Sequence, residues 1–296
     1  MFSETTLLFK TMVILSSQIG IVFGLAYFII HQAKAAYENK TKLFGYSFRA
    51  SMNMNKELDL VPYIESPKKF PVFMTKLEEE RFDNETKEIK PEHTLTIKVN
   101  SREEALNKIR DGYSFKLKDR LFPIFIAWFV GLWVTLFLAM SGVSLPIGIT
   151  IFTIQSIAFG IILGFIMLLT DENDGLKALK IVFFVTLLTG YIGYSDFYSF
   201  SENIGLQFIL LFSLLGLIIL SIVRTFVSFS RKATRYQAIF GAIIFSLYLL
   251  VDFNLIKKRE GIIGMNNWET AFELAFALYL DIINLLLEIL EAMGNS

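Results

Sequence analysis

The strongest chemical signal in the sequence is a carboxylate near the middle of an apolar segment. Asp281 lies about midway between Trp268 and Met293, a stretch long enough to cross a bilayer. A charged carboxylate at the centre of a membrane helix costs roughly 2.5–3.5 kcal/mol, so it is expected to face the interior of a helix bundle and to have a partner there. Asp281 is therefore the first candidate for a residue that handles a cation or a proton.

Other polar side chains share one face of the same predicted helix. Asn284 and Glu288 follow Asp281 at i+3 and i+7, Glu291 follows at i+10, and Glu273 precedes it at i−8. This mostly acidic stripe predicts a path for a cation or a proton. The alternative for the three glutamates is an interfacial position near the helix ends. The depth of Asp281 rules out that alternative for the aspartate.

Other kinds of chemistry have little support in the sequence. The chain contains no cysteine and two histidines, which excludes disulfides and thiolate metal sites and leaves too few ligands for a histidine site. No nucleophile with a base, no metal-ligand cluster and no phosphate-binding loop is recognisable in the apolar segments. The 28 basic and 28 acidic residues give a net charge of zero. We therefore predict a protein that is not an enzyme, has no cofactor and does not bind nucleic acid.

Long apolar segments are the elements that must position these carboxylates. The hydrophobic fraction of 54% exceeds what a soluble domain needs for its core. Backbone groups in hydrocarbon must be hydrogen-bonded within their own segment, so runs of about 20 apolar residues predict membrane helices. We expect an all-α integral membrane protein with a seven-transmembrane-helix bundle whose last helix is central. The predicted spans are approximately Thr5–Ile30, Leu121–Ser141, Leu145–Thr170, Leu176–Ser195, Ile204–Val227, Tyr236–Asp252 and Trp268–Met293.

Small and amide side chains within these spans predict contacts between helices. Two glycine pairs have the four-residue spacing that lets helix backbones approach closely, namely Gly20 with Gly24 and Gly160 with Gly164. Gln18 and Gln155 are predicted to form hydrogen bonds between helices.

A polar segment, Lys34 to Arg120, separates the first span from the second. His93 to Val99 alternates polar and apolar residues as a strand does, and Ser101 with Glu104 forms a capping box that predicts a helix to about Arg110. We expect a small α+β insertion, and the alternative is a solvated, partly disordered loop. The domain organisation is thus residues 1–33 as the first transmembrane helix, 34–120 as the soluble insertion and 121–296 as a six-helix transmembrane core.

The distribution of basic residues leaves the orientation in the membrane open. Basic residues occur in loops that must lie on opposite sides, and loops longer than about 60 residues follow the positive-inside rule poorly. We expect a multi-pass protein of the inner membrane in a bacterium, or of the endoplasmic reticulum or Golgi in a eukaryote.

Two segments near the end of the chain resemble a known signature. Phe240 to Asp252 followed by Leu278 to Leu290 is similar to the C-terminal signature of the transmembrane Bax inhibitor motif family, most closely its lifeguard branch. Three earlier segments resemble, in order, the first helix of that family, the start of the third, and the link between the fourth and fifth. These segments are Phe9–Gln18, Ile151–Ser156 and Tyr194–Phe197.

The resemblance implies a seven-helix fold in which two acidic residues approach each other, one on each of the last two helices. In this sequence they are Asp252 and Asp281. The family is associated with pH-sensitive calcium leak and, in eukaryotes, with protection from cell death. This chain departs from the pattern in two ways. Leu121–Ser141 lacks the arginine that bacterial members carry in the second helix, and Glu288 occupies a position that is usually apolar.

Two functions are weighed on this basis. The favoured function is a pH-sensitive calcium or cation leak channel, because two carboxylates close together in a low-dielectric site cannot both ionise easily and are expected to share a proton. Calcium is then the permeant ion and binds transiently near Asp252 and Asp281. The alternative for the pair is that Asp252 reaches water while Asp281 bonds to a neighbouring helix. The alternative function is a non-catalytic modulator that binds a membrane partner, such as a quality-control protease, through residues 34–120.

Overall fold

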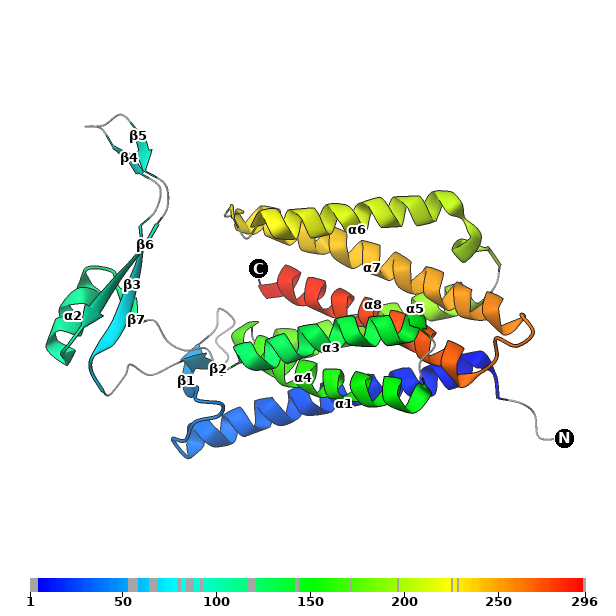
Figure 1. Cartoon of the computed structure of the whole chain (residues 1–296), viewed down its shortest axis with the longest axis horizontal. Coiled ribbons are helices and arrows are strands. Elements are labelled where there is room, and N and C mark those ends of the chain that lie inside the picture. The colour runs from blue at the N-terminus through cyan, green and yellow to red at the C-terminus, as the bar shows by residue number, and fades with distance from the viewer. Residues whose placement is uncertain are drawn as a thin grey trace.

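The protein consists of a bundle of long helices and a small β-rich insertion (Figure 1). The computed structural model describes residues 5–52, 58–63, 69–78, 81–83, 88–90, 93–115, 121–141, 144–170, 172–195, 197–224, 226–227 and 229–294. The bundle helices are α1 (Leu7–Glu38), α3 (Phe122–Ser141), α4 (Leu145–Thr170), α5 (Glu172–Tyr194), α6 (Ile204–Arg224), α7 (Arg231–Glu260) and α8 (Trp268–Gly294). A short 3-10 helix, η1 (Phe200–Glu202), precedes α6.

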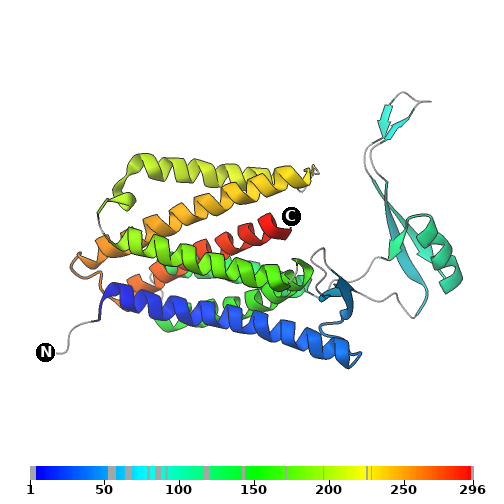
Figure 2. The same cartoon turned by 180° about the vertical axis from the view of Figure 1, so that it is seen from behind.

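Consecutive bundle helices run in opposite directions. We call the end of the bundle at which α1 ends and α3 begins the insertion end, and the other end, where α7 ends and α8 begins, the N-terminal end. In the view from behind, α1 (blue) runs along the near face from the N-terminus toward the insertion (Figure 2).

Five of the described helices are long and apolar enough to cross a membrane: α1, α4, α5, α6 and α7. Helix α3 contributes a shorter apolar stretch, Pro123–Leu138. Large apolar side chains are exposed on the outside of the bundle, such as Phe137, Phe184 and Phe212, which are 68%, 67% and 66% exposed. Water would not favour such a surface, whereas the acyl chains of a bilayer do. The chain is therefore a multi-pass integral membrane protein.

Helix α8 lies at the centre of the bundle, as its polar stripe led us to expect. It contacts α1, α3, α4, α5 and α7. Its aromatic side chains Phe276 and Tyr279 are buried and pack edge-to-face on Phe152 of α4, with ring centroids 5.2 and 4.8 Å apart. The other helices thus keep most of α8 away from lipid.

Helix α7 is longer than the span predicted for it. The apolar segment was expected to end at Asp252, but the helix continues to Glu260. Each basic side chain in its last turn has an acidic partner: Lys257 with Glu260 (3.9 Å), Lys258 with Glu202 (3.8 Å) and Arg259 with Glu273 (3.0 Å). Cations are also favourable at a helix C-terminus. Asp252 therefore lies about two turns inside the helix rather than at its end.

The two glycine pairs behave differently although their spacing is the same. A Cβ atom at Gly164 would lie 2.7 Å from the Cβ of Ile29, and one at Gly160 would lie 2.9 Å from the carbonyl oxygen of Val22, so both glycines let α4 press against α1. Gly20 and Gly24 have no atom within 4 Å of that position, so the expectation of close packing is wrong for them.

The two glutamines predicted to bond between helices also differ. Gln18 of α1 donates a hydrogen bond to the hydroxyl of Thr153 on α4 at 3.1 Å. Gln155 is buried, and its side chain forms no hydrogen bond with the described part of the chain.

Part of the insertion packs directly on the bundle. Strands β1 (Ser47–Met52) and β2 (Leu58–Tyr63) form an antiparallel hairpin that contacts α1 and α4. Phe48 of this hairpin is buried in the bundle core. Just before it, the rings of Phe44 and Tyr46 lie 5.9 and 5.4 Å from that of Phe165 on α4. The hairpin thus belongs structurally to the membrane part of the molecule.

The rest of the insertion forms an outer unit. Strand β3 (Val72–Glu78) lies between β6 (His93–Val99) and β7 (Ser114–Phe115) in an antiparallel sheet, and β4 (Arg81–Asp83) pairs with β5 (Glu88–Lys90). Helix α2 (Arg102–Arg110) is capped by Ser101, whose hydroxyl accepts a hydrogen bond from the backbone N–H of Glu104 at 3.2 Å. Met74, Val99 and Ala105 form the small hydrophobic core of this outer unit.

Candidate ion path between α7 and α8

The centre of the site is a contact between two carboxyl groups. Asp252 on α7 and Asp281 on α8 lie close enough to act electrostatically on each other. The Oδ2 atom of Asp281 is buried and accepts no hydrogen bond from the described residues. Tyr248, one turn earlier on α7, lies close enough to interact electrostatically with both. The packing of α7 on α8 thus brings two acidic side chains together inside the bundle.

The polar stripe on α8 extends from the pair toward both ends of the bundle. At 1.5 Å per residue, Glu273 and Glu291 are roughly 27 Å apart along the helix axis. This is close to the thickness of the hydrocarbon core, about 30 Å. Asn284 is partly exposed and lies between Asp281 and Glu288 on this stripe. The stripe is therefore long enough to connect the two faces of a bilayer.

An arginine pairs with the carboxylate at each end of the stripe. Arg259 of α7 forms an ion pair with Glu273 at 3.0 Å, and Arg224 of α6 forms one with Glu291 at 2.5 Å. All four side chains are partly exposed to the surroundings. Arg259 also acts electrostatically on Asp252. The end carboxylates are thus neutralised by ion pairs, and an interfacial position for them stays a prediction.

Glu288 differs from these end carboxylates. Its Oε2 atom is buried and accepts no hydrogen bond from the described residues. Glu291 and Arg224 are the charged groups that act on it. The carboxylate lies against Gly241 of α7, where a Cβ atom would come within 2.5 Å of its Cδ. A glycine on α7 therefore provides the space that this carboxylate occupies.

Sequence reasoning missed a polar clamp beside the aspartate pair. Asn254 is fully buried. Its Nδ2 donates to the backbone carbonyls of Gly193 (3.0 Å) and Tyr198 (3.2 Å), and its Oδ1 accepts from the backbone N–H (3.0 Å) and the hydroxyl (2.9 Å) of Ser201. The clamp joins α7 to the end of α5 and to η1. The only signal for it in the sequence is an amide side chain two residues after Asp252.

A second missed contact fixes the start of α1 to the loop before α8. Lys10 is buried, and its ammonium group donates to the backbone carbonyl (2.7 Å) and side-chain oxygen (3.0 Å) of Asn266. Asn266 in turn donates to the carbonyl of Thr5 at 3.0 Å. This contact holds the N-terminal end of α8 in place relative to α1.

The site does not have the form of a permanent metal centre. Among the described residues, no group of three or more His, Asp or Glu side chains is arranged to hold a metal ion. Two carboxylates alone leave most coordination positions of a calcium ion to water or backbone oxygens.

One family comparison is informative for this chain. The sequence model of the family described as "Bax1-I: Inhibitor of apoptosis-promoting Bax1" matches residues 106–296. The match includes every bundle helix from α3 to α8, and with them both aspartates, and it begins within α2.

Proposed function

Because this chain belongs to the Bax inhibitor-1 family, we propose that it is a pH-sensitive calcium leak channel controlled by Asp252 and Asp281. The observation that carries the proposal is that the packing of α7 on the central helix α8 brings these two carboxyl groups together, with one buried oxygen of Asp281 lacking a hydrogen-bond partner among the described residues. Membership of the lifeguard branch stays a prediction.

The protonation of the pair is proposed to act as the switch. While one proton is shared, the two acids attract each other and hold α7 against α8. Loss of that proton leaves two like charges in contact, which repel strongly because the surroundings screen them poorly. A divalent cation relieves the repulsion by binding between the carboxylates. Protons and calcium therefore compete for the same place, and calcium gains as the pH rises.

The stripe on α8 is the proposed path from the pair to the insertion end. We propose Glu288 as the intermediate site on this path, because one oxygen of its carboxylate is buried between α7 and α8 and has no hydrogen-bond donor among the described residues. The ion pairs Arg259–Glu273 and Arg224–Glu291 reduce the net negative charge at the two mouths. In this proposal Arg259 supplies the positive charge near Asp252 that an arginine in the second helix supplies in bacterial relatives.

Flux in liposomes that contain only the full-length protein tests this function. Calcium entry is measured with a trapped indicator dye while calcium and pH are varied independently. The proposal expects calcium flux whose half-saturating concentration falls as the pH rises. A matched control is Asp174→Asn, which removes an aspartate paired with Lys177 at 2.9 Å near the start of α5, away from the stripe. Absence of calcium flux at every pH contradicts the channel function.

A second function is favoured by the surface of the insertion. Leu106 and Ile109 of α2 are 54% and 46% exposed, and Phe73 on β3 is 55% exposed, although the outer unit lies outside the apolar bundle. Exposed apolar side chains on a polar module mark a place where another protein binds. In this alternative the protein is a non-catalytic modulator whose insertion recruits a membrane partner such as a quality-control protease.

Removal of the outer unit separates the two functions. Residues 69–115 are replaced by a short flexible linker, and the hairpin β1–β2 is kept because Phe48 belongs to the bundle core. A channel retains its flux without the outer unit, whereas a docking module loses its partner. Changing Leu106 and Ile109 to serine in the intact protein tests the same surface without a deletion.

A further inference from the structure

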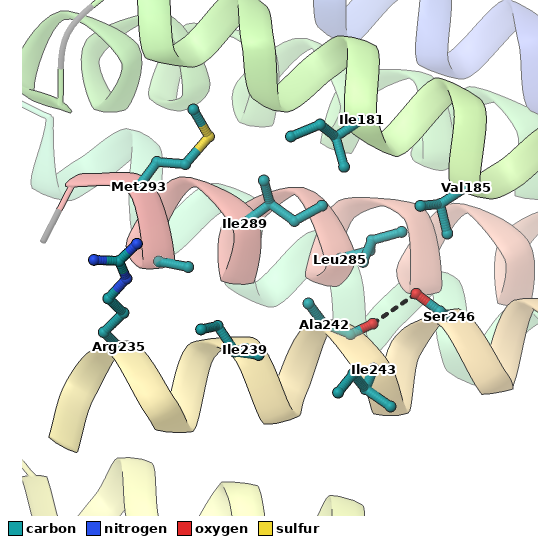
Figure 3. A pocket seen from close by; sticks show the side chains of 11 residues that line it. Ile181, Val185, Arg235, Ile239, Ala242, Ile243, Ser246, Leu285, Ile289 and Met293 are labelled. Atoms are coloured by element: carbon teal, nitrogen blue, oxygen red, sulfur yellow. Dashed lines mark hydrogen bonds between the residues drawn. The ribbon is translucent and has the colours of Figure 1, made fainter. Parts of the chain in front are cut away.

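A groove of about 350 Å³ opens between α5, α7 and α8 (Figure 3). Its walls are aliphatic and include Ile181 and Val185 of α5, Ile239 and Ile243 of α7, and Leu285 and Ile289 of α8. It lies on the insertion side of the close contact that Gly193 of α5 makes with the backbone of α7 at Leu250. The volume is within the range of small-molecule sites.

The groove opens to the outside of the bundle. Ile181, Ile239 and Ile243 are 43%, 43% and 54% exposed. In a multi-pass membrane protein, apolar side chains left uncovered at the depth of these helices face acyl chains. The molecule that fills the groove therefore comes from the bilayer.

The two ends of the groove differ in polarity. Arg235 stands at one end and Ser246 at the other (Figure 3). The Ser246 hydroxyl donates to the carbonyl of Ala242 at 2.7 Å, so the inner end offers no free donor. The Arg235 side chain is exposed, and it forms no ion pair with a carboxylate in the described part of the chain. A ligand for this groove thus needs an apolar body and an anionic end.

The length of the groove matches one leaflet of a membrane. Arg235 lies just after the start of α7 at Arg231, where the helix enters from the insertion end. From Arg235 to Ser246 the helix rises roughly 16 Å. Half of the hydrocarbon core is about 15 Å. A phosphate at Arg235 thus allows one acyl chain to reach the inner end.

We propose that this groove binds an acyl chain of an anionic phospholipid whose phosphate pairs with Arg235. Basic pockets between membrane helices bind acidic headgroups. A lipid without net charge carries its own cation beside the phosphate, so its attraction to Arg235 is weaker. The groove lies on the side of α7 that faces α5, and lipid binding to it can be measured directly, without any ion flux.

Native mass spectrometry of the full-length protein tests the site. The probes are phosphatidylglycerol and phosphatidylcholine with identical oleoyl chains. Arg235→Gln is expected to lower phosphatidylglycerol binding about fivefold and to leave phosphatidylcholine binding unchanged. Lys232→Gln, an exposed basic residue one turn away that does not line the groove, serves as the matched control and is expected to change either affinity less than twofold. Ala242→Leu fills the groove and should lower the binding of both lipids.

Four outcomes overturn the proposal. Equal losses for Arg235→Gln and Lys232→Gln indicate attraction to a basic surface rather than to a site. Unchanged binding of both lipids in Ala242→Leu shows that the acyl chain lies elsewhere. A dimer whose formation displaces the lipid, measured by light scattering, makes a second copy of the chain the occupant. Inorganic phosphate at the concentration of the lipid serves as a further probe, and displacement of the lipid by phosphate contradicts the need for an acyl chain.

Discussion

Gly241 of α7 faces the carboxylate of Glu288 on α8 so closely that a Cβ atom at position 241 would lie 2.5 Å from Cδ and 2.7 and 2.8 Å from the two oxygens. Gly241→Ala therefore forces the carboxylate to move. Because it is the end of a flexible side chain, we expect the helices to stay in place and the free energy of unfolding to fall by less than about 1 kcal/mol. Calcium flux should change as in Glu288→Gln. The double variant should match either single variant, because both act on one group. If Gly241→Ala lowered the free energy of unfolding as much as a clash with backbone atoms does, Glu288 would have no room to move.

The aspartate pair predicts a non-additive loss of pH dependence. Asp281→Asn and Asp252→Asn each remove one of the two titrating acids but keep the shape of the side chain. Each variant should therefore lose the fall in half-saturating calcium with rising pH, and the double variant should behave like the singles. The measurement is calcium flux in liposomes over a series of pH values. The acid-pair mechanism has to be abandoned if both single variants keep the pH response of the parent protein.

The contact between α1 and α4 predicts that alanine substitution destabilises the protein at one glycine and not at another, although each glycine belongs to a pair with four-residue spacing. Gly164→Ala would place a Cβ atom 2.7 Å from the Cβ of Ile29 and 3.1 Å from the carbonyl oxygen of Ala26, so the helices must move apart. We expect a loss of about 1–3 kcal/mol in the free energy of unfolding. Gly24→Ala meets no atom within 4 Å and serves as the control, with a change of less than about 0.5 kcal/mol. Thermal unfolding in detergent compares the two, and equal losses would contradict the packing of α4 on α1.

The Asn254 clamp predicts a structural loss beside the site. Asn254→Ala leaves buried backbone groups of Gly193, Tyr198 and Ser201 without their partner. Leaving such groups unpaired costs about 1–3 kcal/mol. The control is Asn39→Ala, because the exposed Asn39 side chain bonds only within its own helix end, to Ala35 at 2.9 Å. Amide exchange at residues 193–201 should accelerate in Asn254→Ala and stay unchanged in Asn39→Ala.

The ends of a helix can be predicted from the sequence where hydropathy determines them, but not where pairing with distant side chains determines them. Most of the predicted apolar segments match bundle helices to within a few residues, because a run of apolar residues must bond internally in lipid. Helix α1 is an exception, since it continues beyond its predicted end at Ile30 to Glu38. The end of α7 could not be found in this way. Lys257 to Glu260 is polar, yet it stays helical because its charges are paired with Glu202, Glu273 and one another.

The site residues also divide into those that the sequence reveals and those that only the structure reveals. Depth in an apolar segment singled out Asp281 without any structure, and the family resemblance added Asp252. The partners of Glu273, Glu291 and Glu288 lie on helices far away in the sequence, namely Arg259, Arg224 and Gly241. No spacing within one helix reveals such partners. The glycine pairs make the point most simply, since the same four-residue spacing packs α4 on α1 but leaves Gly20 and Gly24 uncovered.

The central position of α8 also has a consequence for biosynthesis. Helix α8 follows every other bundle helix in the chain, yet it contacts α1, α3, α4, α5 and α7. During translation the earlier helices enter the bilayer before α8 has been synthesised. Until then, the faces that later pack on α8 contact lipid or the insertion machinery. Ribosomes stalled before residue 268 should therefore carry chains whose α1 is still open to protease or to lipid exchange. The helix that follows the other bundle helices in the chain thus completes their common core.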